Sequence, residues 1–102
     1  MKPWIAIAAL LAAPAVNTLA ADVAAGEKKA AVCFACHGKD GHASMKNYPN
    51  LAGQSPEYLV IALKGYRDGT RLDPIMVPMA KALSDADMEN IAAYFARFEQ
   101  QR

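Results

Sequence analysis

The sequence predicts an all-α domain made of a few helices joined by irregular loops. Apolar residues recur three and four positions apart in several segments, and each such segment begins after a residue type that caps helices. No convincing alternation of apolar and polar residues indicates a strand, and no internal repeat is present. The 102 residues are enough for one small domain.

The first predicted helix runs from Val23 to Phe34, with Asp22 as its N-cap. Gly26 lies inside this helix, where it costs about 1 kcal/mol relative to alanine. Two explanations stay open: another element approaches the backbone closely there, or the glycine lies on the surface. The following segment, 38–50, is rich in glycine and polar residues and is predicted to be a loop.

The second predicted helix begins after Ser55, which caps it, and has Pro56 at its first position. Gly69 is expected to end it. Its apolar stripe has helical spacing and consists of Leu59, Ala62, Leu63 and Tyr66. The segment 68–81 contains two prolines and is predicted to be irregular.

The last predicted helix has the clearest start signals. Ser84 is its expected N-cap, Asp85 and Asp87 lie in its first turn, and Leu83 and Met88 are spaced as a hydrophobic staple. We expect its buried stripe to contain Met88, Ile91, Ala92 and Phe95, with Tyr94 and Phe98 beside it.

The N-terminal segment 1–20 has the composition of a secretory signal peptide, with a lysine, an apolar run and then small residues. We expect cleavage after Ala20, with Ala15 and Ala21 as alternatives, and export to the periplasm as a single domain over 21–102. An uncleaved anchor is the other interpretation, but the run of about 10 residues is short beside the roughly 20 that a spanning helix needs.

Charge and size restrict the possible functions. The 11 basic and 10 acidic residues nearly balance, and nothing indicates the clustered basic face of a nucleic-acid-binding protein. A domain of this size has a thin core and usually needs a disulfide, a metal or a cofactor to fold well.

Both cysteines of the chain lie in the motif Cys33-Phe34-Ala35-Cys36-His37, which is typical of covalent c-type haem attachment. Two intervening residues on one helical turn direct both sulfurs at the two vinyl groups of one porphyrin. The adjacent imidazole of His37 then reaches the iron. The motif therefore predicts one covalently bound haem c, with His37 as an iron ligand, and electron transfer as the function.

Other interpretations of the motif are weaker. A structural disulfide would use the same two cysteines, whereas a redox-active dithiol needs an alternating strand and helix pattern that is missing here. A zinc site would have to combine Cys33, Cys36, His37 and His42, and no second pair lies at the spacing of a zinc finger.

The second iron ligand is expected some 40 residues downstream, where Met76 and Met79 have enough chain to reach the opposite face of the haem. His42 and Met45 lie too close to the motif, and Met88 fits the core stripe of the last helix. Residue spacing alone does not separate Met76 from Met79, nor does it exclude a five-coordinate iron.

These segments together resemble the class I c-type cytochromes, in particular the small bacterial monohaem members and single domains of the dihaem ones. The resemblance covers 22–98 and implies the class I cytochrome c fold, helices and loops around one covalent haem. It also implies Met76 as the second ligand, from its interval to Leu83, with Met79 in reserve. The matching motifs are Gly26, Cys33 to Gly38, Pro49 to Gly53, Tyr66 to Gly69, Met76 to Met79, and Leu83 to Asp85.

The resemblance further implies what surrounds the haem. The carbonyl of Pro49 is expected to accept the ring N–H of His37, and Gly26 and Tyr94 are expected where the first and last helices cross. The expected pocket lining is Tyr48, Leu51, Leu59 and Leu63.

We therefore expect a periplasmic electron carrier, not an enzyme, whose partners are redox proteins such as a quinol-oxidising complex, a terminal oxidase or a periplasmic dehydrogenase. Lys39, Lys46 and Lys81 are hypothesised to form a weakly basic rim that steers such partners. One alternative is a haem c subunit permanently associated with a periplasmic oxidoreductase. Another is an enzyme or gas sensor with five-coordinate iron.

Overall fold

A computed structural model describes residues 20–100 of the chain. This part contains no strand, so the all-α prediction is confirmed for it. The predicted signal peptide falls almost entirely on residues 1–19, outside the described part. The helical elements follow the order α1 (Val23–Ala30), a 3-10 turn η1 (Ala31–Cys33), α2 (Phe34–His37), α3 (Pro56–Asp68), α4 (Met76–Lys81) and α5 (Asp85–Ala96).

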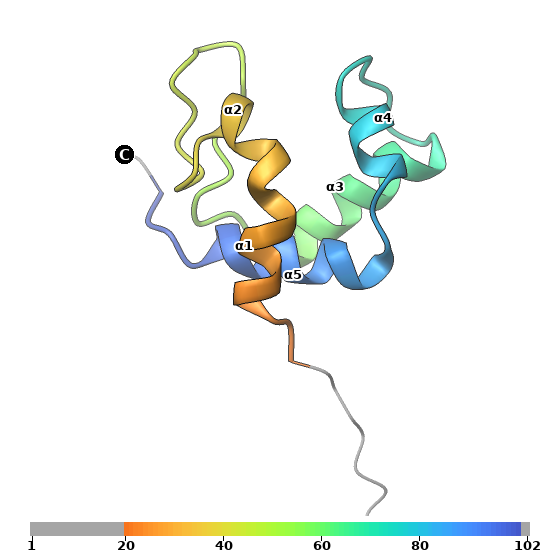
Figure 1. The fold of residues 1–102 in the computed structure, drawn as a ribbon. Coiled ribbons are helices and arrows are strands. Elements are labelled where there is room, and N and C mark those ends of the chain that lie inside the picture. Colours follow the sequence, from red (N-terminus) through yellow and green to blue (C-terminus); the bar gives the residue numbers. More distant parts are fainter. Residues whose placement is uncertain (1–19, 101–102) are drawn as a thin grey trace, which may run out of the picture.

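Helix α5 forms the base of the domain, because α1 and α3 both pack against it (Figure 1). Helix α4 packs on α3. Met88 is completely buried, as predicted, and Tyr94, which we expected beside the stripe, is only 1% exposed. The buried cluster consists of Ala30, Leu59, Val60, Leu83, Met88, Ile91, Ala92, Tyr94 and Phe95.

The crossing of α1 and α5 answers the question left open about Gly26. This glycine is buried, and a Cβ atom placed on it would lie 2.0 Å from the carbonyl oxygen of Asn90. The two backbones therefore meet at this point. The Asn90 side chain completes the contact by accepting the backbone N–H of Asp22 at 2.9 Å.

All three predicted N-caps are present. Asp22 accepts the N–H of Ala25, and Ser55 accepts the N–H of Tyr58. At the start of α5, Ser84 Oγ accepts a hydrogen bond from the N–H of Asp87, and the carboxylate of Asp87 accepts one from the N–H of Ser84, each at 3.0 Å. Gly69, with φ of +85°, ends α3 as predicted.

We expect Ser84→Ala to lower the free energy of unfolding by about 1 kcal/mol, because the N–H of Asp87 loses its acceptor. Denaturant unfolding of the haem-loaded protein measures this change. Ser44→Ala is the matched control, since Ser44 is exposed in the loop after the cysteine motif and caps no helix. An equal loss in both variants would contradict the role of the cap.

The first predicted helix is not a single regular helix. Its residues stay helical, but the chain tightens into η1 between α1 and α2. A 3-10 turn has three residues per turn in place of 3.6, so it changes the direction in which the following side chains point. His37 therefore lies at the end of a short separate helix.

The prediction of an irregular segment over 68–81 is wrong at its end, where α4 forms. Pro78 is the third residue of α4, and the first residues of a helix have no intrahelical partner for their N–H groups, so the proline breaks no bond. Asp73 Oδ1 accepts the N–H groups of Ile75 and Met76, both at 2.9 Å. The N-cap residue of α4 is Ile75, which has no side-chain acceptor, so the carboxylate of Asp73, two residues earlier, accepts these N–H groups in its place.

Candidate functional site

One ring nitrogen of His37 is hydrogen-bonded to the main chain, an arrangement that is common among metal-binding histidines. Its side chain is buried, and Nδ1 lies 2.8 Å from the carbonyl oxygen of Pro49, as the resemblance implied. A carbonyl oxygen can only accept, so the proton of the neutral ring is on Nδ1. The lone pair is then on Nε2, which makes no hydrogen bond within residues 20–100.

The loop 38–50 places Pro49 behind this ring. Gly41 O accepts the N–H groups of Leu51 and Ala52 at 2.8 and 3.0 Å, which joins the two ends of the loop. Gly41 has φ of +79°, and a Cβ there would lie 2.5 Å from the nitrogen of Ala52. The glycine therefore permits the close approach that brings Pro49 back to His37.

Both cysteines are free, half-buried thiols. Burial, together with the charge of the neighbouring Cys36, raises the pKa of Cys33 from 9.0 to about 11. A reactive dithiol requires the opposite, a lowered thiol pKa. Within residues 20–100 no group of three or more His, Cys, Asp and Glu side chains is arranged to hold a metal ion.

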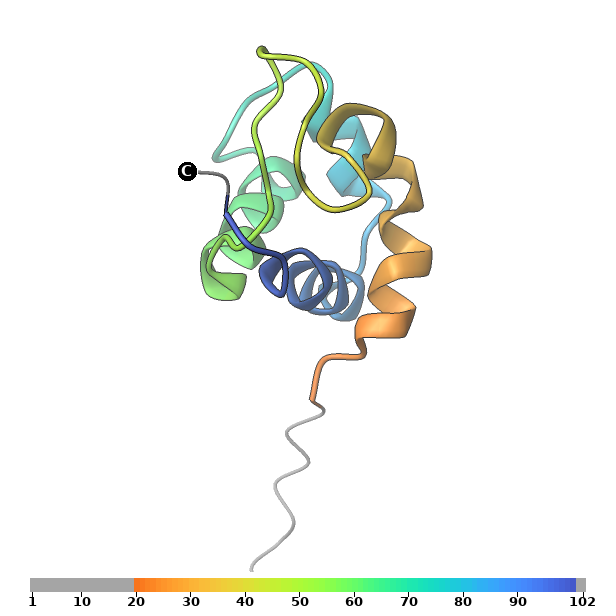
Figure 2. The same ribbon diagram turned by 90° about the vertical axis from the view of Figure 1, so that its left-hand side faces the viewer.

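Met76 and Met79 are both half-buried and lie three residues apart on α4, so they share one side of that helix. Helices α2 and α4 lie at the same end of the molecule and on opposite sides of it (Figures 1 and 2). The geometry therefore offers a sulfur donor across from His37. It does not choose between the two methionines.

The other residues considered as ligands have different environments. Met45 is 54% exposed and Met88 is in the core. Both ring nitrogens of His42 lie against oxygen atoms, 3.0 Å from Asp40 Oδ2 and 2.7 Å from the carbonyl of Glu99. His42 is therefore engaged elsewhere.

The residues present fit a c-type haem. Such a haem requires two thiols, an imidazole nitrogen and a second ligand such as a thioether sulfur. The chain provides two free cysteines, Nε2 of His37 and the methionines of α4. The expected lining is partly in place: the ring of Tyr48 stands edge-on to His37 at 6.5 Å between centroids, and Leu51 and Leu63 are half-buried against the core. Leu59 is a core residue, only 6% exposed. Contact of these four with haem stays a prediction.

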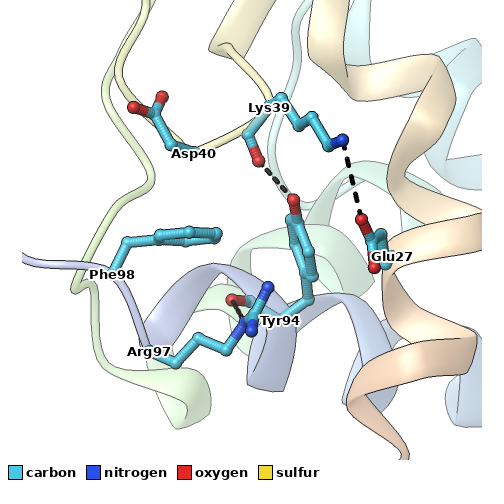
Figure 3. A pocket seen from close by; sticks show the side chains of 6 residues that line it. All are labelled: Glu27, Lys39, Asp40, Tyr94, Arg97 and Phe98. Atoms are coloured by element: carbon cyan, nitrogen blue, oxygen red, sulfur yellow. Dashed lines mark hydrogen bonds and ion pairs between the residues drawn. The ribbon is translucent and has the colours of Figure 1, made fainter.

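Sequence reasoning missed a second set of contacts, between the turn after the motif and the end of α5. The hydroxyl of Tyr94 donates to the carbonyl of Lys39, as Figure 3 shows, and Lys39 also lies 3.9 Å from Glu27. A hollow of about 500 Å³ lies here, lined by Glu27, Lys39, Asp40, Tyr94, Arg97 and Phe98. Since Tyr94 and Lys39 are 55 residues apart, no local pattern could have shown this contact.

The all-α fold, the Cys-x-x-Cys-His motif and the buried His37 bonded to Pro49 are typical of one class of protein, the haem-binding electron-transfer proteins. The family model for cytochrome c matches residues 23–97. The chain therefore belongs to the cytochrome c family, whose members bind haem c covalently and are electron carriers rather than enzymes. The chain has an electron-transfer role.

Cytochrome c-554(548) of Halomonas halodenitrificans is 51% identical over 83 residues, which cover 78% of this chain and 100% of that protein. The thiosulfate dehydrogenase electron acceptor of Stutzerimonas stutzeri is 42% identical over 79 residues, 74% of this chain and 37% of that protein. Reduced recombinant cytochrome c4 from Pseudomonas stutzeri has a crystal structure with a TM-score of 0.73 and 42% identity, over 78% of this chain and 47% of that chain.

The chain thus spans all of the first relative but less than half of the other two. The solved structure confirms the class I cytochrome c fold. No helix within residues 20–100 is long and apolar enough to cross a membrane.

Proposed function

We propose that this protein is a periplasmic monohaem cytochrome c that carries single electrons between larger redox proteins. The observation that carries the proposal is the buried His37 ring, held through Nδ1 by Pro49 with Nε2 free, directly after two free thiols. These are the only cysteines in the chain, which supports one haem. Export rests on the composition of segment 1–20.

Each residue has a defined task in this proposal. Cys33 and Cys36 would form the two thioethers to the haem, and His37 and Met76 would supply the iron ligands, with Met79 as the reserve. The carbonyl of Pro49 fixes the ring of His37 and makes it a more basic ligand. Haem iron, when bound, supplies the one-electron couple.

The ligand pair sets the behaviour of the carrier. A neutral imidazole with a thioether gives a comparatively high reduction potential. With two protein ligands the iron would have no open position for a substrate, and the task of His37 and Met76 would be to stay bound through the redox cycle. A periplasmic dehydrogenase is a suitable donor, supported by the likeness to an electron acceptor of thiosulfate dehydrogenase.

Carbon monoxide tests whether the iron is closed. We expect no rapid binding of carbon monoxide to the reduced protein at neutral pH, measured as the absence of a change in the Soret band. Met76→Ala is the positive control, because it removes the proposed second ligand and would leave a position free for carbon monoxide. Rapid binding to the wild type would contradict the carrier and favour a five-coordinate enzyme or sensor.

A second candidate function is that of a haem subunit permanently bound to a periplasmic oxidoreductase. It is favoured by apolar surface beside α4, where Leu72 is 83% and Ile75 50% exposed. A hollow of about 370 Å³ lies there, lined by Leu72, Asp73, Pro74, Val77 and Pro78. Co-purification of a larger subunit in constant proportion from the native host would support this candidate, and recovery of the haem protein alone would contradict it.

A further inference from the structure

His42 joins two parts of the chain that are distant in sequence. Its Nδ1 lies 3.0 Å from Asp40 Oδ2, and its Nε2 lies 2.7 Å from the carbonyl oxygen of Glu99 in the C-terminal tail. The backbone N–H of His42 donates to the other carboxylate oxygen of Asp40, also at 3.0 Å. Both ring nitrogens and both carboxylate oxygens are therefore engaged.

Both contacts are hydrogen bonds at the same time only when the ring is doubly protonated. The carbonyl of Glu99 can only accept, so Nε2 must carry hydrogen. Nδ1 could accept only from a protonated Asp40, but the bonds from the ring and the N–H of His42 lower the pKa of that carboxyl. The carboxylate is thus ionised, and Nδ1 carries hydrogen as well. The same contacts with Asp40 and Glu99 raise the pKa of His42 above 6.5.

The charged groups around this contact are few. Asp40 comes from the same turn as His42, and the tail contributes the main chain of Glu99. Lys39, Glu27 of α1 and Arg97 after α5 line the hollow that Asp40 also borders (Figure 3). Within residues 20–100, Asp40 is the only acidic group within ion-pair distance of His42.

The turn that contains His42 is hydrogen-bonded to the residues that follow Pro49, the residue whose carbonyl contacts His37. Beside His42, Gly41 O holds Leu51, and the N–H of Ala43 donates to Asn50 Oδ1 at 2.8 Å. Leu51 and Asn50 follow Pro49, whose carbonyl holds the ring of His37. On the other side of the turn, the hydroxyl of Tyr94 donates to the carbonyl of Lys39. The turn is thus fixed to α5 and to the tail at two points.

We infer that the His42 imidazolium is a positioning residue for iron ligation: it ties the loop that carries Pro49 to the C-terminal tail and so holds the ring of His37. The inference rests on the proposed ligation by His37. It gives the loop a pH-dependent attachment, because a neutral imidazole can donate to Asp40 or to Glu99 but not to both.

The sign of the pH effect follows from the raised pKa. The attachment is complete below pH 6.5, the ordinary pKa of histidine, and is lost as the pH rises through the higher pKa of His42 in the folded protein. The neutral ring keeps its one hydrogen on Nδ1, because the charged carboxylate of Asp40 is a stronger acceptor than the carbonyl of Glu99, so the bond to the tail is the one that breaks. The loop then loses one of its two ties while Tyr94 still holds Lys39. We expect a looser loop and not an unfolded protein.

Hydrogen exchange of the His37 Nδ1 proton, followed by NMR in the reduced, haem-loaded protein, tests this inference. At each pH the rate in His42→Gln is divided by the rate in the wild type, which removes the general effect of pH on exchange. We expect a ratio of about tenfold below pH 6.5, since one charged hydrogen bond of the loop is missing. Above the pKa of His42 the ratio should fall toward one, because the wild type has also lost the tie.

Two controls separate this role from a general loss of stability. Lys46→Gln removes a positive charge from the same loop, and its ratio should stay near one. The same ratio is also measured with Asp40→Asn in both proteins. It should then fall at a lower pH, because the carboxylate that raises the pKa of His42 is missing. A ratio that stays constant with pH would overturn the role of His42, provided that the His37 ring protons show the ring-current shift of a haem ligand. Absence of that shift would instead overturn the proposed ligation, and with it the positioning role.

Discussion

Replacing Met76 with alanine is expected to abolish the near-infrared methionine-to-iron band of the oxidised protein. It should also lower the midpoint potential by roughly 200 mV or more, because a thioether ligand raises the potential and axial ligands tune haem over about 0.8 V. Met76 is half-buried at the first position of α4, opposite α2. Absorption spectroscopy and redox titration measure the two effects.

Met79→Ala is the matched control, since Met79 lies on the same side of α4 one turn later and is also half-buried. It should keep the band and shift the potential by only a small fraction of the change in Met76→Ala. Loss of the band in Met79→Ala alone would make Met79 the ligand. Such a result would leave the conclusions about the fold and the haem attachment unchanged. It would change only which residue of α4 is the ligand.

Gly26→Ala is expected to lower the free energy of unfolding by about 3 kcal/mol. The new Cβ would lie 2.0 Å from the carbonyl oxygen and 2.5 Å from the carbonyl carbon of Asn90, so α1 and α5 must move apart. The gain of about 1 kcal/mol from replacing glycine in a helix offsets only part of this cost. Denaturant unfolding of the haem-loaded protein measures the difference.

Gly65→Ala provides the comparison, because Gly65 also lies inside a helix. A Cβ there would be 3.2 Å from the Cβ of Arg71 and 3.3 Å from Oγ1 of Thr70, which is much milder crowding than the 2.0 Å approach at Gly26. We expect a change within about 1 kcal/mol in either direction, since helix propensity and crowding oppose each other. Equal stability of Gly26→Ala and the wild type would show that the crossing of α1 and α5 is looser than described.

Local signals predicted the start of each long helix correctly. Ser84 and Asp87 form the expected reciprocal bonds, and Gly69 ends α3 in the left-handed conformation. The same kind of reasoning missed α4, because Pro74 before the helix and Pro78 within its first turn are helix breakers in most contexts. Asp73 starts this helix through a side chain whose place only the folded loop defines.

The sequence by itself determined the family, the helical content and the haem-attachment motif, because these depend on residue types at short, fixed spacings. The pair Cys33 and Cys36 with His37 is of this kind. The resemblance implied the carbonyl of Pro49 behind the ring of His37, and the structure has that bond at 2.8 Å. Only the tertiary structure showed that His42 contacts a tail carbonyl 57 residues away. Such contacts depend on how distant segments meet around a core, which no spacing within one segment specifies.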